Sequence, residues 1–190
     1  MSVATTWGTT PGERERDFPC DLFVKSPEAA YYRGITIRAQ PELIFRWLCQ
    51  IRVAPYSYDW IDNLGRQSPR VLILGLDELA IGQQALGGSE VIDFERDRHL
   101  TVRTILGSFE QRLFGDSLVS YLIVPEDSDR CRLLVKLAVN FPRGPLGWFW
   151  RVFLPWGELI MMRKQLLNFQ QLAEQTSNRE LPEDSGAHPH

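Results

Sequence analysis

The chain changes its hydrophobic period near its start. Residues 31–38 alternate apolar and polar side chains, as a half-buried strand does. Residues 41–51 instead repeat apolar side chains every three or four positions, which predicts a helix of about three turns. Pro55 ends this helix, and residues 56–63 can form only a short second one. We therefore expect a strand followed directly by two short helices.

Short alternating runs dominate the stretch from residue 82 to residue 141, which predicts a series of β-strands. Polar connections rich in turn-forming residues separate the runs, and no helical crossover long enough for parallel pairing interrupts them. The strands are therefore expected to pair as an antiparallel meander. They cover residues 89–94, 100–106, 108–114, 118–124 and 132–140.

The clearest helical pattern runs from Leu159 to Ala173, where apolar side chains step by three and four and polar side chains take the other side. One face of this long helix must be buried. A strand, two short helices, a meander and a long terminal helix can share one core only if the sheet curls around that helix. The predicted fold class is α+β, with a curved antiparallel sheet of about six or seven strands around a long C-terminal helix.

The two ends of the chain differ in composition from the middle. Residues 1–21 mix Thr, Gly and Pro with alternating charges, and residues 176–190 hold almost no apolar side chain. Such compositions bury too little surface to offset the entropy lost on ordering. We expect residues 22–175 to form a single ligand-binding domain between two flexible tails, since a chain of 190 residues has room for one core of this size.

Charge and residue usage argue against several classes of partner. The formal net charge is −3, and no run of Lys and Arg is long enough to follow a phosphate backbone, so we expect no nucleic-acid partner. Three widely spaced cysteines fit reduced thiols better than disulfides or a metal site. Because the sequence shows neither a secretory signal nor a glycine-rich phosphate loop, it indicates a cytoplasmic location and no cofactor.

Three short segments carry a family resemblance. Residues 56–64 read YSYDWIDNL, residues 132–136 read RLLVK and residues 162–167 read MRKQLL. They look like the YSYDWLENL, TRLIVR and MERRML segments of the bacterial SRPBCC branch of the START-like superfamily, which includes polyketide cyclases, lipid-transfer START domains and the birch-pollen allergen group. The resemblance spans residues 31–175, and it implies the helix-grip fold with an apolar pocket between sheet and helix.

Four neighbouring side chains in the first of these segments are candidates for the ligand site. Tyrosine hydroxyls and a carboxylate beside an indole can orient an oxygenated ring compound at the rim of a pocket. The alternative is that the carboxylate caps the short helix and the rings only pack. These candidates are Tyr56, Tyr58, Asp59 and Trp60.

The segment from Pro145 to Trp156 is rich in aromatic side chains at helical spacing, and Trp148 and Trp156 are its candidate site residues. Three interpretations stay open: a lid over the pocket, a core or homodimer-contact helix, and a peripheral membrane contact with the rings inserted between headgroups. Arg151 and Pro155 interrupt the apolar stretch, which is too short to span a bilayer.

The long helix and the strands supply the remaining candidates. Glu158 and Gln165 place polar atoms near an apolar pocket, where a ligand, a water or a neighbour has to satisfy them. Met162 and Phe169 are candidates to line or gate the pocket. Strand residues can point to either face, because a one-residue register error exchanges the faces. This uncertainty applies to Arg103, Tyr121 and Lys136, of which the first two are candidate pocket residues.

The sequence contains no evident catalytic constellation, because His99 lies in a turn-like stretch and His188 and His190 lie in the C-terminal tail. The function that fits these patterns best is binding of a hydrophobic small molecule, polyketide-, isoprenoid- or lipid-like, between sheet and helix. One alternative is an enzyme of cyclase, aromatase or dehydratase type acting on such a ligand. The other is a peripheral membrane or protein-contact module built on the segment 145–156.

Overall fold

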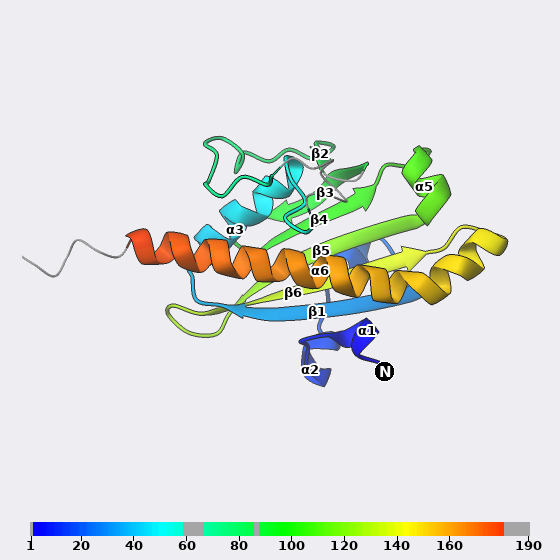
Figure 1. The fold of residues 1–190 in the computed structure, drawn as a ribbon, viewed down its shortest axis with the longest axis horizontal. Coiled ribbons are helices and arrows are strands. Elements are labelled where there is room, and N and C mark those ends of the chain that lie inside the picture. Colours follow the sequence, from blue (N-terminus) through cyan, green and yellow to red (C-terminus); the bar gives the residue numbers. More distant parts are fainter. Residues whose placement is uncertain (1, 59–66, 86–87, 181–190) are drawn as a thin grey trace, which may run out of the picture.

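A computed structural model describes residues 2–58, 67–85 and 88–180. Within these residues, a six-stranded sheet and one long helix form two layers (Figure 1). In chain order the elements are α1 (Val3–Thr6), α2 (Pro11–Arg14), η1 (Pro19–Leu22), β1 (Ala29–Ile37), α3 (Pro41–Cys49), η2 (Gln50–Arg52), β2 (Gln84–Ala85), β3 (Ser89–Glu95), β4 (His99–Thr104), α5 (Phe109–Phe114), β5 (Asp116–Pro125), β6 (Cys131–Asn140) and α6 (Pro145–Glu180).

The sheet is the expected antiparallel meander. Each strand from β2 to β5 pairs with the next one along the chain, and β1 pairs with the outer edge of β6. The strand order is therefore β1-β6-β5-β4-β3-β2. Five predicted strands agree with β1, β3, β4, β5 and β6 to within two residues at each end. The expected short helix at 56–63 falls mostly on residues outside the described part of the chain.

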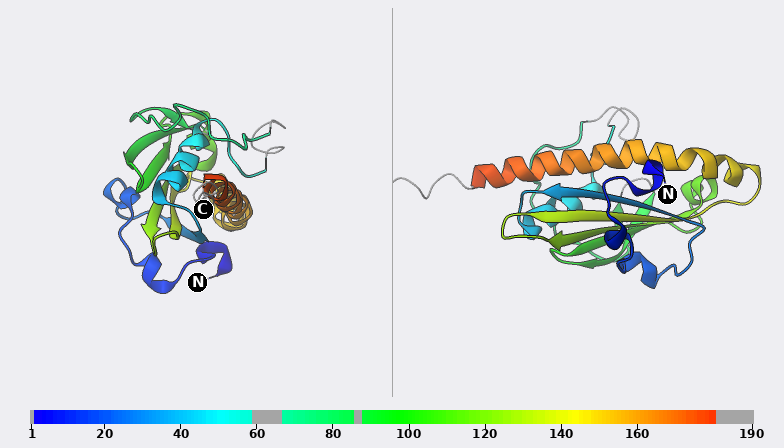
Figure 2. Two further views of the ribbon diagram at one scale, coloured as in Figure 1. Left: turned by 90° about the vertical axis from the view of Figure 1, so that its left-hand side faces the viewer. Right: turned by 90° about the horizontal axis from the view of Figure 1, so that it is seen from below.

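Helix α6 runs along the concave side of the sheet (Figures 1 and 2). Its buried stripe, which includes Leu166, Phe169 and Ala173, packs in the main hydrophobic core with inward side chains of the strands, such as Val135, and with helix α3. The period of two along the strands and the three-to-four spacing along α6 bring these side chains together. The prediction of a curved sheet around a long C-terminal helix is confirmed.

The segment 108–114, which the alternating pattern predicts as a strand, is instead helix α5. The Ser108 hydroxyl accepts a hydrogen bond from the Gln111 N–H and so caps the first turn. Gly115 ends the helix with a φ of 92°, a left-handed conformation that glycine adopts without steric cost. The prediction was wrong because the apolar spacing in a stretch of seven residues does not distinguish a helix from a strand, and the serine at its start caps a helix.

Residues 145–156 and 159–173, predicted as two helices, form the single helix α6, which also passes residue 175, the expected end of the domain. Pro155 lies inside it. A proline inside a helix removes one backbone hydrogen bond, but α6 continues through it, with packed side chains on both sides such as Leu154 and Met162. In the described part of the chain, no helix has the length and apolar character needed to cross a membrane.

The N-terminal residues 2–21 lie against the sheet, although their composition predicts a flexible tail (Figure 2). The Gly34 N–H of β1 donates a 3.1 Å hydrogen bond to the carbonyl of Trp7. The two backbones lie so close together that a Cβ at Gly8 would be 2.1 Å from the Gly34 carbonyl oxygen. Only glycine, which has no Cβ, fits at this position. Composition misses these contacts because they are made with strands far away in the sequence.

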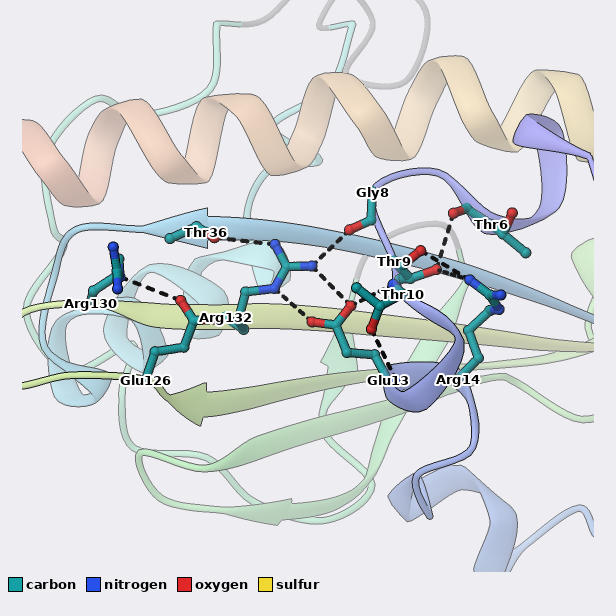
Figure 3. A network of polar contacts seen from close by, with 10 residues as sticks. All are labelled: Thr6, Gly8, Thr9, Thr10, Glu13, Arg14, Thr36, Glu126, Arg130 and Arg132. Atoms are coloured by element: carbon teal, nitrogen blue, oxygen red, sulfur yellow. Dashed lines mark hydrogen bonds and ion pairs between the residues drawn. The ribbon is translucent and has the colours of Figure 1, made fainter.

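Arg132 of β6 holds the same segment (Figure 3). Its Nε donates to the Glu13 carboxylate at 2.7 Å, and its Nη2 donates to the Gly8 carbonyl at 2.7 Å. Burial favours the neutral form of Glu13, but hydrogen bonds from Arg132 and from the Thr10 N–H outweigh it, so the pKa of Glu13 lies below its ordinary value. This pair fixes helix α2 to the edge of the sheet.

Residues around η1 cover the outer, convex face of the sheet. Phe18 and Cys20 are buried there, and the Cys20 N–H donates to the hydroxyl of Ser120 on β5 at 2.9 Å. Lys136 of β6 donates to the Asp21 carboxylate at 2.6 Å and lies over the Phe18 ring. The packed part of the chain therefore begins well before residue 22, the expected start of the domain.

Candidate functional site

A cavity of about 260 Å³ lies between the inner face of the sheet and helix α6. Strands β2 to β5 contribute one wall, the segment from η2 to residue 57 contributes a second, and α6 contributes the third. The fold thus gathers side chains that are far apart in the sequence. The lining residues are Ile51, Pro55, Ser57, Ala85, Ser89, Val102, Val119, Tyr121, Glu158, Met161, Met162 and Gln165.

Two hydrogen bonds join the three walls. The Tyr121 hydroxyl of β5 donates to Oε1 of Gln165 on α6 at 2.8 Å, and Nε2 of Gln165 donates to the Pro55 carbonyl at 2.7 Å. A hydroxyl oxygen and an amide oxygen can each accept a further hydrogen bond. The Tyr121 and Gln165 oxygens are therefore two acceptors that the cavity can offer to a bound molecule, besides those of the polar lining residues Ser57, Ser89 and Glu158.

The Tyr121 phenol is neutral at physiological pH. Burial raises its pKa far above the ordinary value, and the negative charge of Glu158 adds to this, although the bond to Gln165 acts in the opposite direction. A phenol in this state donates or accepts a hydrogen bond but does not act as a base.

Opposite charges border one edge of the cavity. Arg33, Tyr31 and Glu158 surround a small void beside it. Arg33 is only 2% exposed, and its terminal nitrogens donate at 2.8 Å to the carbonyls of Tyr32 and Ala4. Burial lowers the pKa of this guanidinium, and the Glu158 carboxylate opposes that effect. Among the described residues, no three His, Cys, Asp or Glu side chains lie together as a metal site requires.

Four of the predicted site residues line the cavity, and they come from two elements. The alternation of β5 turns Tyr121 inward, which settles the face that the sequence left open. The helical spacing of α6 turns the other three toward the sheet. These four residues are Tyr121, Glu158, Met162 and Gln165.

Arg103 and Lys136 point to the convex face of the sheet, away from the cavity. The Arg103 guanidinium donates two hydrogen bonds, of 3.0 and 2.6 Å, to the Asp116 carboxylate. Lys136 is paired with Asp21, as described above. The prediction of Arg103 as a pocket residue was therefore wrong, because a strand sequence with polar residues on both faces does not fix the register.

Tyr56 and Phe169 belong to the core rather than to the cavity wall. Both side chains are buried, and their ring centroids lie 5.3 Å apart. Tyr56 has a φ of 55°, which is uncommon for a residue other than glycine. The Asn168 side chain donates a 2.7 Å hydrogen bond to the Tyr56 carbonyl and helps to hold this conformation.

The two tryptophans expected in a lid point to solvent. Trp148 is 69% exposed and Trp156 is 59% exposed, and neither lines the cavity. The lid and core interpretations are therefore wrong for these two side chains. Tyr58 also does not line the cavity, and Asp59 and Trp60 lie outside the described residues.

Sequence reasoning missed most of the apolar lining. Val102 and Val119 lie on strands that were predicted, so the alternation along those strands was the signal that could have found them. Met161 lies one residue before Met162 and three residues after Glu158, so it borders the inward stripe of α6, and its long side chain reaches the cavity. Ala85 belongs to the two-residue strand β2, which carries no period to detect.

Comparison with known proteins gives matches in structure only. No protein-family model matches the chain, and comparison with curated proteins gave no match. Norcoclaurine synthase from Thalictrum flavum matches with a TM-score of 0.50 at 13% identity, over 76% of this chain and 85% of that chain. The protein XoxI from Bacillus cereus matches with a TM-score of 0.50 at 13% identity, over 76% of this chain and 95% of that chain.

These likenesses concern the architecture, because fold is retained at identities where function is not. The matches show that the chain shares its overall fold with these two proteins. The chain therefore has the helix-grip fold, the fold that the resemblance of its short segments implied.

Proposed function

We propose that this protein binds a hydrophobic small molecule in the cavity between the sheet and α6. The observation that carries the proposal is the cavity itself, about 260 Å³, with mostly apolar walls and a few polar groups, among them the Tyr121 hydroxyl, the Gln165 amide and the Glu158 carboxylate. Small-molecule sites typically combine apolar walls with a few fixed polar groups in this way.

The cavity volume limits the ligand. It lies just below the range of roughly 300–1,000 Å³ that is usual for small-molecule sites, so a long acyl chain or an extended polycyclic compound would not fit inside. Among polyketide-like, isoprenoid-like and lipid-like compounds, the volume favours a compact molecule of one or two rings. A hydroxyl on such a ligand would donate to Oε1 of Gln165 or to the Tyr121 oxygen.

The probe 2-naphthol tests the proposal, because it combines two apolar rings with one hydroxyl. At roughly 25 cal/mol per Å² of apolar surface removed from water, we expect a dissociation constant in the micromolar to submillimolar range, measured by isothermal titration calorimetry. Val119→Phe fills the cavity from β5 and should abolish binding. Val124→Phe adds the same group on the convex face of the same strand and should preserve it. Equal affinity of the parent and Val119→Phe would contradict the proposal.

An enzyme of cyclase, aromatase or dehydratase type is the second candidate. It is favoured by Glu158, a carboxylate in the cavity wall near the neutral Tyr121 phenol, because a base and a hydrogen-bond donor on one cavity are what proton transfer requires. If the protein turns over a model poly-β-keto substrate, Glu158→Gln should lower kcat. A variant with the parent's kcat would remove Glu158 from any mechanism.

A further inference from the structure

Helix α5 lies beside the start of α6 at one end of the molecule (Figures 1 and 2), and apolar side chains of both helices are exposed. The two helices are joined by a stack of the Phe114 and Trp150 rings, with centroids 4.9 Å apart, and by a 2.7 Å hydrogen bond from Trp150 Nε1 to the Leu113 carbonyl. The exposed members, which we call the aromatic patch, are Leu106, Phe109, Phe114, Trp148, Phe149, Val152, Phe153 and Trp156.

The patch lies on the outer face of α6, where a helix packed on a sheet ordinarily carries polar residues. Phe149, Phe153 and Trp156 form a stripe about half a turn away from the stripe that faces the cavity. In the second half of the helix the corresponding outer positions hold Leu167, Gln171 and Glu174, so the aromatic side chains do not continue there. Packing against the sheet therefore accounts for one apolar face of α6 but not for the outer stripe in its first half.

Basic side chains border the patch. Arg112 in α5, Arg143 just before α6 and Arg151 in α6 are all exposed. Arg151 pairs with Glu28, whereas no ion pair joins Arg112 or Arg143 to any residue in the described ranges. The acidic side chain in α5, that of Glu110, packs against the backbone just before β3. Arg112 and Arg143 therefore add positive charge to the two elements that carry the patch, although the chain as a whole has a net charge of −3.

We propose that the aromatic patch docks on the surface of an anionic lipid bilayer. Tryptophan and phenylalanine rings on one helix face insert at the level of the headgroups, and arginines at the rim pair with lipid phosphates. A second copy of this chain is a poorer occupant, because a two-fold contact would bring the arginines of one copy close to those of the other. Docking does not depend on whether the cavity binds a ligand.

Flotation of the full chain with phosphatidylcholine vesicles, with and without phosphatidylserine, tests this proposal. The parent should float with the anionic vesicles, and less so as salt is added. Trp148→Ala with Trp156→Ala should reduce the vesicle-bound fraction by about tenfold or more. Arg112→Gln with Arg143→Gln should weaken binding to anionic vesicles by roughly fivefold for each arginine.

Leu22→Ala with Leu74→Ala is the matched control, since these leucines are 79% and 91% exposed but lie outside the patch. This control should float like the parent, and all variants should keep the parent's melting temperature because the changed side chains are exposed. A parent that floats with neither vesicle overturns the proposal, as does a tryptophan variant that floats as well as the parent. The proposal is also overturned if the parent sediments as a dimer and the tryptophan variant sediments as a monomer.

Discussion

The Tyr121 hydroxyl and the Gln165 amide meet across the cavity, where the phenol of β5 donates a 2.8 Å hydrogen bond to the side chain of α6. The same amide donates to the Pro55 carbonyl. One glutamine thus ties the helix to the sheet and to the segment after η2. Because these contacts are polar and directional, they hold the three walls together at one end while the apolar space beside them stays unfilled.

Tyr121→Phe should lower the free energy of unfolding by about 1 kcal/mol, the usual net value of one hydrogen bond. Gln165→Leu should cost more, about 1–3 kcal/mol, because it leaves both the Tyr121 hydroxyl and the Pro55 carbonyl without this partner. Urea denaturation measures both values. Two variants as stable as the parent would mean that the walls are not joined in this way in solution.

Phe18→Ala tests whether the N-terminal segment is part of the folded domain. Phe18 is buried on the convex face of the sheet, so truncation should cost about 3 kcal/mol or more. Leu22→Ala, four residues away but largely exposed, should change stability by less than about 0.5 kcal/mol. If both variants unfold at the parent's urea midpoint, the segment is a free tail, as its composition suggests.

Glu13 should make stability depend on pH. Its pKa is lowered in the folded state, so the stabilisation by its charged form is complete above the ordinary glutamate pKa of about 4.3 and is lost as the pH falls through the folded-state value. The stability difference between the parent and Glu13→Gln should therefore be largest near neutral pH and should vanish in acid. Glu15→Gln, a change at an exposed neighbour, is the matched control and should alter stability at neutral pH by less than about 0.5 kcal/mol. A pH-independent difference for Glu13→Gln would contradict the Arg132 pairing.

The three thiols should be unreactive in the folded protein. Cys20, Cys49 and Cys131 are buried and free, and burial raises the pKa of Cys49 to about 12 and that of Cys131 to about 11. Ellman's reagent at mildly alkaline pH should therefore react slowly with native protein and rapidly with all three thiols in urea. Rapid reaction of the native protein would show that the core opens readily.

The sequence predicted the helices and strands in which the spacing of apolar residues repeats over many positions. The strand ending in Ile37 and the helix stripe up to Ala173 each run long enough for one period to stand out. The seven-residue segment from Ser108 to Phe114 was too short for that, and the capping hydroxyl decided its conformation. The contacts of Arg132 with the N-terminal segment depend on three-dimensional proximity, which composition does not encode.

The candidate site was predicted where the helix fixes the direction of a side chain. Glu158, Met162 and Gln165 follow from the spacing of α6. On the strands, one candidate lines the cavity and one does not, because the register of a strand decides which face a side chain occupies. Tyr121 points into the cavity, whereas Arg103 points to the convex face and binds Asp116.

Methyl NMR of the methionines tests the central claim most directly, because Met161 and Met162 line the cavity and the chain has only three methionines. The two signals are assigned with Met161→Leu and Met162→Leu. On titration with 2-naphthol, both signals should shift and saturate together, and both should show nuclear Overhauser contacts to the naphthol rings. Methionine signals that stay unchanged while 2-naphthol is present in excess would contradict a ligand site between the sheet and α6.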